Sequence, residues 1–414
     1  MNQTAVSPSR PEVLAPAGDL GRLKAALQYG ADAVYLAGKE FGMRGGVPNF
    51  DPEQLAQGVE LAHEKGVKVY VTANTLQRND EIERYPEFAS YLKQIGVDAV
   101  IINDMGALML TKQYAPDMEL HLSTQSGITN YQTARAFYEL GAKRVVLARE
   151  LSLEEIAEIR AKTPADLELE VFVHGAMCMS VSGRCLISNY LTDRDANRGQ
   201  CAQPCRWRYH LVEEKRPGEY FPIVEEPGAG TYILNAKDLC MIEHLDQLVQ
   251  AGVSSLKIEG RAKSAYYVAV VTNAYRMALE DYLAHPKDWV LPDWLGEEVR
   301  KVSHRRYSTG FYFGKPDQYY DKVGYIRTYE SAAVALDWRD GWLKVAQRNK
   351  FSVGETLEAV IPGEHFLPLP VTALEDEDRN AIPNACHAEM IAWLPCETPL
   401  EPGIVIRRAT GQKG

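Results

Sequence analysis

Short apolar runs alternate with amphipathic stretches along the first 290 residues of the chain. The eight apolar runs lie at 12–17, 33–38, 67–74, 98–104, 120–125, 144–149, 167–174 and 255–259. Stretches with helical periodicity follow them. The one at 153–162 begins after Ser152, and Ser152 and Glu155 have the spacing of a capping box. Strands that alternate with helices predict a parallel sheet. Eight such units over about 250 residues predict a closed (β/α)8 TIM-like barrel, an α/β fold.

Beyond residue 320 the pattern changes to short apolar runs joined by turns. The expected strands lie at 323–327, 333–337, 342–346 and 356–360. Asp340 and Gly341 stand between two of these runs and favour a tight hairpin turn. We therefore expect a small C-terminal all-β domain, either a barrel or a sandwich.

These patterns divide the chain into parts of different character. We expect a flexible N-terminus at 1–11, the barrel at 12–290, a linker at 291–319 and the β domain at 320–414. The gap between the last two barrel strands is long, and a loop of this length is usually functional. It holds the insertion at 175–240, in which four of the seven cysteines cluster within 28 residues.

Charge and hydropathy limit the class of protein. The chain begins with polar residues, and no apolar run is long enough to cross a bilayer, so we expect a cytoplasmic protein that does not enter a membrane. The net charge of −11 argues against a protein that coats nucleic acid with its whole surface. A local basic patch remains compatible with this charge.

The four clustered cysteines are Cys178, Cys185, Cys201 and Cys205. In a reducing compartment, clustered thiols indicate metal ligands or redox catalysts before disulfides. The intervening stretches have six, fifteen and three residues, and only the last has the short spacing common in zinc sites. An iron–sulfur cluster, a zinc ion and unligated buried cysteines all stay open at this point. We expect Cys240, Cys386 and Cys396 to be small buried apolar residues.

Polar residues gather at the ends of the predicted barrel strands, where the chemistry of such barrels takes place. They are Asn74, Gln125, Arg149, His174, Lys257, Glu259 and Arg261. Arg149, Lys257 and Arg261 could clamp a small anion with two carboxylates. Glu259 and His174 could move protons. Each residue could instead cap or bridge the barrel rim, and a lone histidine is more often structural.

Signatures of hydrolases are missing from the sequence. It contains neither a zinc-protease helix motif nor the serine elbow of the α/β-hydrolases. His174 and Cys178 could form a local nucleophile–base pair, but that pair leaves the other three clustered cysteines without a role.

The run from Glu170 through His174 and Cys178 to Cys185 resembles the signature of the collagenase-like peptidase family U-thirty-two. The segments 13–18, 146–153 and 255–261 are also similar to that family. The ending Cys201-Ala-Gln-Pro-Cys205-Arg-Trp207 and the segment 235–239 resemble its prephenate-dependent tRNA uridine hydroxylase branch.

This resemblance implies a specific activity. It implies a tRNA-modifying enzyme that binds a 4Fe-4S cluster through the four clustered cysteines and uses prephenate as co-substrate. It also implies the tRNA anticodon stem-loop as partner and 5-hydroxylation of the wobble uridine as reaction. Two alternatives stay open, a peptidase of the collagenase-like family and a zinc-stabilised binding module.

Arginines accumulate around the cysteines, against the acidic balance of the chain. The candidates for RNA contact are Arg198, Arg206, Trp207 and Arg208. Unpaired bases are bound by stacking on aromatic or guanidinium planes as well as through phosphates. Trp207 could stack in this way, or could pack over a cluster as an apolar shield.

Overall fold

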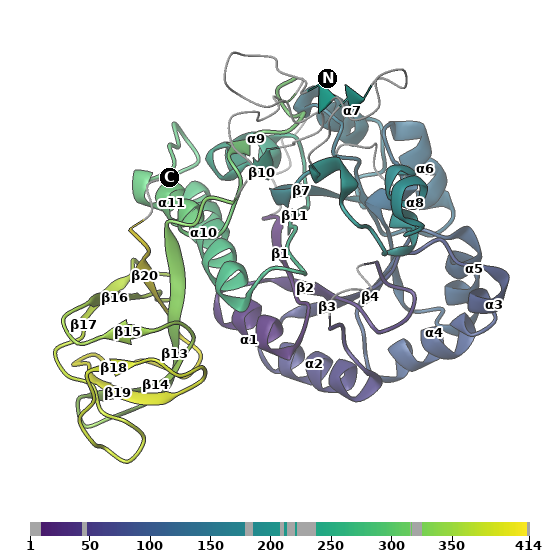
Figure 1. The fold of residues 1–414 in the computed structure, drawn as a ribbon. Coiled ribbons are helices and arrows are strands. Elements are labelled where there is room, and N and C mark those ends of the chain that lie inside the picture. The colour runs from purple at the N-terminus through teal and green to yellow at the C-terminus, as the bar shows by residue number, and fades with distance from the viewer. Residues whose placement is uncertain are drawn as a thin grey trace.

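The structure is a computed structural model that describes residues 10–43, 48–178, 185–207, 211–212, 220–221, 237–314, 316 and 325–411. Eight parallel strands form a closed barrel (Figure 1). They are β1 (Glu12–Pro16), β2 (Ala33–Leu36), β3 (Lys68–Ala73), β4 (Ala99–Ile102), β5 (Glu119–Leu122), β6 (Arg144–Val146), β7 (Glu168–Ala176) and β11 (Ser255–Ile258). Because β11 pairs with both β1 and β7, the sheet closes, and the predicted (β/α)8 architecture is confirmed.

Helices surround the barrel on its outside (Figure 1). They are α1 (Leu20–Gln28), α2 (Pro52–Glu64), α3 (Asn79–Ile82), α4 (Tyr85–Gln94), α5 (Met105–Tyr114), α6 (Tyr131–Glu139), α7 (Leu153–Ala161), α9 (Leu245–Gln250) and α10 (Ala265–Ala284). The predicted capping box is present, since Ser152 accepts from the backbone of Glu155 and Glu155 accepts from the backbone of Ser152. No helix of the described ranges is both long enough and apolar enough to span a bilayer.

Charged side chains occupy the interior of the barrel toward the amino-terminal ends of its strands, where aliphatic side chains are the usual filling. Arg144 on β6 contacts Glu12, Glu168 and Glu170, with Nη1 3.1 Å from Oε2 of Glu170. Lys257 on β11 lies 2.6 Å from Oε1 of Glu170. Arg144, Glu170 and Lys257 are all buried, so this network compensates charges that have lost their water.

The C-terminal part forms an antiparallel sheet with strand order β17-β16-β20-β13-β14-β19. The strands are β13 (Tyr329–Arg339), β14 (Trp342–Gln347), β16 (Thr356–Ala359), β17 (Leu367–Pro370), β19 (Ile391–Pro395) and β20 (Val405–Ala409), beside the pair β15 (Phe351–Ser352) and β18 (Asn384–Ala385). Asp340 and Gly341 both have positive φ, as the tightest hairpin turn requires. The strand expected at 323–327 is not formed by 325–327, where Ile326 makes only an isolated bridge to His304, and its first residues lie outside the described part.

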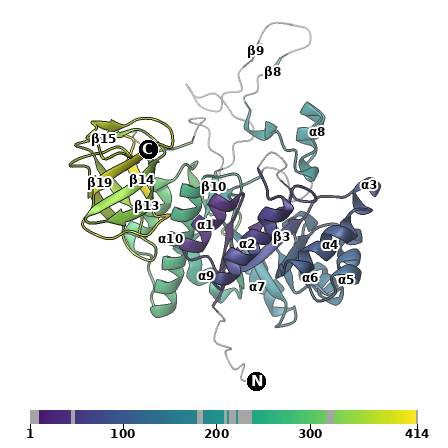
Figure 2. The same cartoon turned by 90° about the horizontal axis from the view of Figure 1, so that it is seen from below.

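The C-terminal domain packs against the side of the barrel that α10 covers (Figure 2). The fully buried Arg407 on β20 binds Glu298 with two hydrogen bonds of 2.6 and 2.7 Å. Glu298 ends α11 (Asp293–Glu298), which lies in the segment expected to be a linker. That segment also contains β12 (Tyr307–Ser308), which pairs with β10 (Asp238–Cys240) beside the barrel. The segment 291–319 is therefore structured over its described residues.

The three isolated cysteines differ in exposure. Cys396 is buried, as expected, whereas Cys240 is only partly buried. Cys386 is exposed, so the expectation of burial is wrong for this residue.

Candidate active site at the barrel mouth

A cavity of about 150 Å³ lies at the carboxyl ends of the barrel strands. Six of the seven predicted mouth residues line it, as do all four clustered cysteines. These residues are Asn74, Gln125, Arg149, Lys257, Glu259, Arg261, Cys178, Cys185, Cys201 and Cys205. His174 is the exception. The structure therefore brings the predicted anion-binding residues and the predicted metal ligands to one place.

Arg261 is held rigidly in the cavity wall. Its side chain is 3% exposed, Nη1 donates to Oγ1 of Thr72 over 2.9 Å, and Nη2 donates to the carbonyl oxygen of Met43. A Cβ on Gly18 would lie 2.1 Å from the carbonyl oxygen of Arg261, so only glycine allows this approach of the two backbones. A guanidinium fixed in this way loses little entropy when it binds an anion.

Arg149 joins the anion-binding wall to the first cysteine. Nη1 donates to the carbonyl oxygen of Ala176 over 2.8 Å, and the guanidinium carbon lies 4.6 Å from the ring centre of Phe172. Nη2 is 3.9 Å from Sγ of Cys178. Arg149 therefore contacts both the barrel wall and the segment that carries the first clustered cysteine.

Lys257 lines the cavity, but its charge is already compensated. Nζ lies 2.6 Å from Glu170 and 4.5 Å from the ring centre of Tyr35. Burial alone would raise the pKa of Glu170, yet Lys257 and Arg144 outweigh it and hold that pKa below its usual value. Of the three residues predicted to bind an anion, Lys257 is thus engaged by Glu170 inside the barrel.

Glu259 is placed by tight backbone packing after β11. Its N–H donates to the carbonyl oxygen of His174 over 2.8 Å, and its own carbonyl oxygen accepts from the hydroxyl of Tyr267 over 2.9 Å. Gly175 has φ +108° and approaches so closely that a Cβ there would lie 2.5 Å from that oxygen. The backbone of Glu259 is thus fixed at a position where the residue lines the cavity.

His174 lies away from the cavity. Its ring is buried among tyrosines, with Nδ1 3.3 Å from the hydroxyl of Tyr275 and Nε2 3.3 Å from the hydroxyl of Tyr307. Burial lowers the pKa of His174 to about 3, helped by His304 and Lys263. The ring is therefore neutral at pH 7 and does not contact the space where a substrate would bind, so the structure gives no support to a proton-transfer role.

The clustered cysteines are free thiols carried by described segments that other contacts organise. The side chain of Asn197 binds the backbone of Cys185: its Oδ1 accepts from the N–H and its Nδ2 donates to the carbonyl oxygen. The N–H of Gln203 donates to Sγ of Cys201 over 3.4 Å. Hydrogen bonds to sulfur are a known means of tuning iron–sulfur clusters. Within the described ranges, no three His, Cys, Asp or Glu side chains form a group that could hold a metal ion. The four thiols are of the chemical kind that binds a 4Fe-4S cluster and they line one cavity, but in their described positions no three of them are grouped as metal ligands.

The predicted RNA-contact residues lie beside the mouth or outside the described part. Arg198 forms an ion pair with Glu81, a partner that the sequence did not reveal. Trp207 is 44% exposed. Arg208 and the side chain of Arg206 fall outside the described residues. Helix α8 (Ile187–Thr192), from the same insertion, projects from one end of the barrel (Figure 2).

A TIM-like barrel with a cysteine-lined mouth and a C-terminal β domain is the architecture described above, and sequence comparison assigns both parts to one protein family. The sequence model of peptidase family U32 matches residues 18–322, and that of the peptidase family U32 C-terminal domain matches residues 327–407. The chain belongs to this family.

Several relatives carry names that state an activity. The chain is 36% identical to tRNA hydroxylation protein P1 of Bacillus subtilis, with 99% of this chain and 97% of the relative covered. It is 36% identical to tRNA hydroxylation protein P of Escherichia coli, with 95% of each covered. It is 44% identical to an uncharacterized protease of Methanocaldococcus jannaschii over 73% of each. Among solved structures, the U32 peptidase Mk0906 matches 63% of this chain and 97% of its own at 17% identity, with a TM-score of 0.40.

Proposed function

We propose that the chain is a tRNA-modifying enzyme that hydroxylates C5 of the wobble uridine, with prephenate as co-substrate and a 4Fe-4S cluster on the four clustered cysteines. The observation that carries this proposal is the single cavity shared by Cys178, Cys185, Cys201, Cys205, Arg149 and Arg261. The names of relatives that match over nearly the whole chain support tRNA as the substrate.

The residues of the cavity suit this reaction. A 4Fe-4S cluster held by the four cysteines would supply electron-transfer chemistry in the cavity. Arg149 and Arg261 bind the carboxylates of the co-substrate. Glu259 is the acid–base group of the cavity and takes the proton that leaves uracil C5.

The peptidase alternative has less support from the geometry. Among the residues that the structure describes, no histidine lines the cavity with the cysteines. His174, the candidate base, is buried behind the wall. A cysteine nucleophile in this cavity would therefore lack the base that activates it.

Nucleoside analysis tests the proposed function directly. Deleting the gene should remove 5-hydroxyuridine and its derivatives from total tRNA, measured by mass spectrometry, and a plasmid copy should restore them. Unchanged nucleosides in the deletion strain would refute the proposal, and gelatin cleavage by the purified protein would favour the peptidase instead.

Replacing Arg261 tests the anion clamp. Arg261→Ala removes a buried guanidinium from the cavity wall, so prephenate binding should weaken by about 2–5 kcal/mol, roughly 30-fold or more in the dissociation constant. Anaerobic calorimetry measures this change. Arg135→Ala, an exposed arginine on α6, is the matched control and should bind like the wild type. Full affinity in both Arg149→Ala and Arg261→Ala would move the anion site elsewhere.

A further inference from the structure

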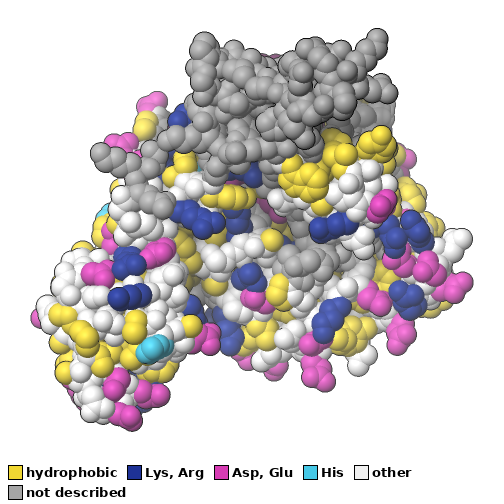
Figure 3. All heavy atoms as spheres, viewed as in Figure 1, with side chains coloured by type: hydrophobic (Ala, Val, Ile, Leu, Met, Phe, Trp, Pro, Cys, Tyr) yellow, Lys and Arg dark blue, Asp and Glu magenta, His cyan; other side chains and the backbone are white. Residues whose placement is uncertain are grey.

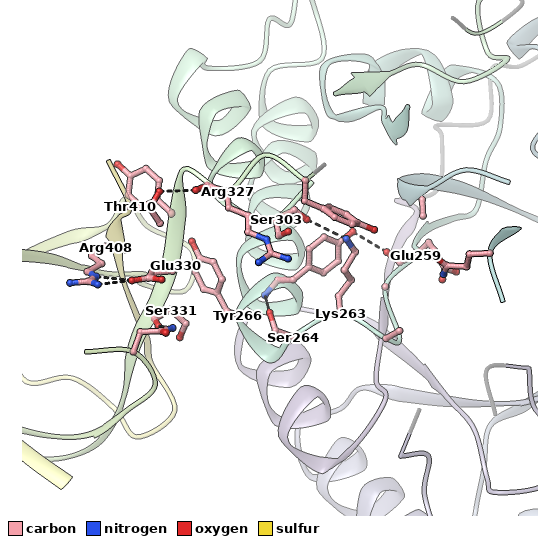
Figure 4. A pocket seen from close by; sticks show the side chains of 18 of the residues that line it. Glu259, Lys263, Ser264, Tyr266, Ser303, Arg327, Glu330, Ser331, Arg408 and Thr410 are labelled. Atoms are coloured by element: carbon pink, nitrogen blue, oxygen red, sulfur yellow. Dashed lines mark hydrogen bonds and ion pairs between the residues drawn. The ribbon is translucent and has the colours of Figure 1, made fainter. Parts of the chain in front are cut away.

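A second and larger hollow, of about 1080 Å³, lies between the barrel and the C-terminal domain (Figure 4). We call it the interdomain groove. Its walls come from the segment after β11, from the start of β13 and from the end of β20, together with residues of the cysteine-bearing insertion. Charged and aromatic residues of its lining include Arg194, Glu259, Lys263, Tyr325 and Arg327, and Cys201 lines it as well.

The groove carries uncompensated positive charge on an acidic protein. Arg194 and Arg327 are exposed and form no ion pair within the part of the chain that is described. Lys263 donates to the carbonyl oxygen of Ser303 over 3.2 Å, so its charge also lacks a carboxylate partner among the described residues. Arg408 is different, because Glu330 and Glu355 both lie 2.7 Å from it. Figure 4 shows Arg327 and Lys263 projecting into the groove, and Figure 3 shows further Lys and Arg side chains over the same face of the molecule.

Aromatic rings stand between these cations. Tyr325 is 37% exposed, with Nζ of Lys263 4.4 Å and the guanidinium carbon of Arg305 5.2 Å from its ring centre. Tyr266 and Tyr329 also line the groove. Aromatic faces interleaved with cations are typical of surfaces that bind single-stranded nucleic acid, where bases stack and phosphates pair.

The interdomain groove borders the candidate active site. Glu259 and Cys201 line both the groove and the smaller cavity, so the two spaces share a wall at these residues. A strand that lies along the groove can therefore place one base at the cavity without leaving the protein surface.

We propose that the interdomain groove binds the single-stranded RNA that flanks the modified nucleotide, with phosphates at Arg327, Lys263 and Arg194 and a base stacked on Tyr325. The base to be modified enters the small cavity past Glu259 and Cys201. This inference rests on the proposed function and adds the C-terminal domain to its substrate site.

Binding of a synthetic, unmodified anticodon stem-loop by the iron-loaded protein tests the groove. Fluorescence anisotropy should show about tenfold weaker binding for Arg327→Glu and a salt dependence reduced by about one phosphate contact. Tyr325→Ala should weaken binding by roughly fivefold or more, because it removes a stacking platform. Iron content and prephenate affinity should stay at wild-type values in both variants, since neither residue lines the small cavity.

Arg339→Glu is the matched control, because Arg339 lies at the other end of β13, about 33 Å along the strand from Tyr329. It carries the same charge reversal in the same domain and should bind RNA like the wild type. Wild-type affinity in both Arg327→Glu and Tyr325→Ala overturns the groove but leaves tRNA hydroxylation standing, because that rests on the nucleosides of cellular tRNA. An equal loss of RNA affinity in Arg339→Glu overturns the proposal that the groove binds RNA. Binding of a polyglutamate peptide that depends on Arg327 and Tyr325 in the same way overturns it as well.

Discussion

Replacing Cys201 by serine should remove the iron from anaerobically purified protein and abolish 5-hydroxyuridine in the tRNA of complemented cells. A 4Fe-4S cluster needs four thiolates, and a serine hydroxyl stays protonated at neutral pH and binds iron poorly. Cys178→Ser, Cys185→Ser and Cys205→Ser should behave in the same way. Iron and sulfide analysis of the wild type should give about four of each per chain.

The fold itself should survive these changes, because none of the four cysteines belongs to the apolar core of the barrel. Cys386→Ser changes an exposed thiol of the C-terminal domain and should retain both iron and activity. Stoichiometric zinc in protein from iron-replete cells would contradict the cluster. Modification that persists after loss of all four cysteines would show that the thiols have no part in the reaction.

Acidification should destabilise the protein through His174. Since burial lowers the pKa of His174 to about 3, from an ordinary value near 6.5, the unfolded chain takes up a proton that the folded chain rejects. The stability that the neutral ring contributes is complete above the pKa of His174 in the unfolded chain. It is lost as the pH falls toward the pKa of His174 in the folded protein. Each pH unit between about 6.5 and 3 should therefore lower the free energy of unfolding by about 1.4 kcal/mol.

His174→Phe should remove this contribution and flatten the pH dependence of urea unfolding relative to the wild type. The new ring suits the site, because the hydroxyls of Tyr275 and Tyr307 keep their own backbone acceptors, Val173 and Val299. His387→Phe, at an exposed position, should leave the slope unchanged. The His174 variant should also keep hydroxylation activity at neutral pH. A stable variant without activity would return His174 to the list of catalytic residues.

The barrel could be predicted from the sequence because buried parallel strands are continuous apolar runs. Each of the eight expected runs overlaps an observed strand, as the run at 12–17 does with β1 (Glu12–Pro16). The mouth residues followed from the same reasoning, since residues at the carboxyl ends of such strands face one opening. The clustered cysteines line the same cavity, although Cys201 and Cys205 lie far from β7 along the insertion.

His174 was misplaced because the alternation of side chains breaks at the end of β7. Phe172 pairs with Lys257 and His174 pairs with Ile258, so β7 carries one extra residue against β11. An irregularity of this kind turns the following side chains to the other face of the sheet. A strand pattern alone contains no mark of such an insertion.

The compensation of Lys257 by Glu170 was also invisible in the sequence. The two residues are 87 positions apart, and only closure of the barrel brings them to 2.6 Å. The interdomain groove escaped prediction for the same reason, because Lys263, Tyr325 and Arg327 meet only once the domains have packed together.

Closure of the barrel by β11 has a consequence for biosynthesis. All four clustered cysteines precede β11 in the chain, and β11 is the strand that joins β7 to β1. A chain emerging from the ribosome therefore presents every thiol before the segment that completes the mouth has been made. With seven of its eight strands made, the nascent barrel is still open between β7 and β1, so the four thiols can be reached from a side that the finished molecule closes.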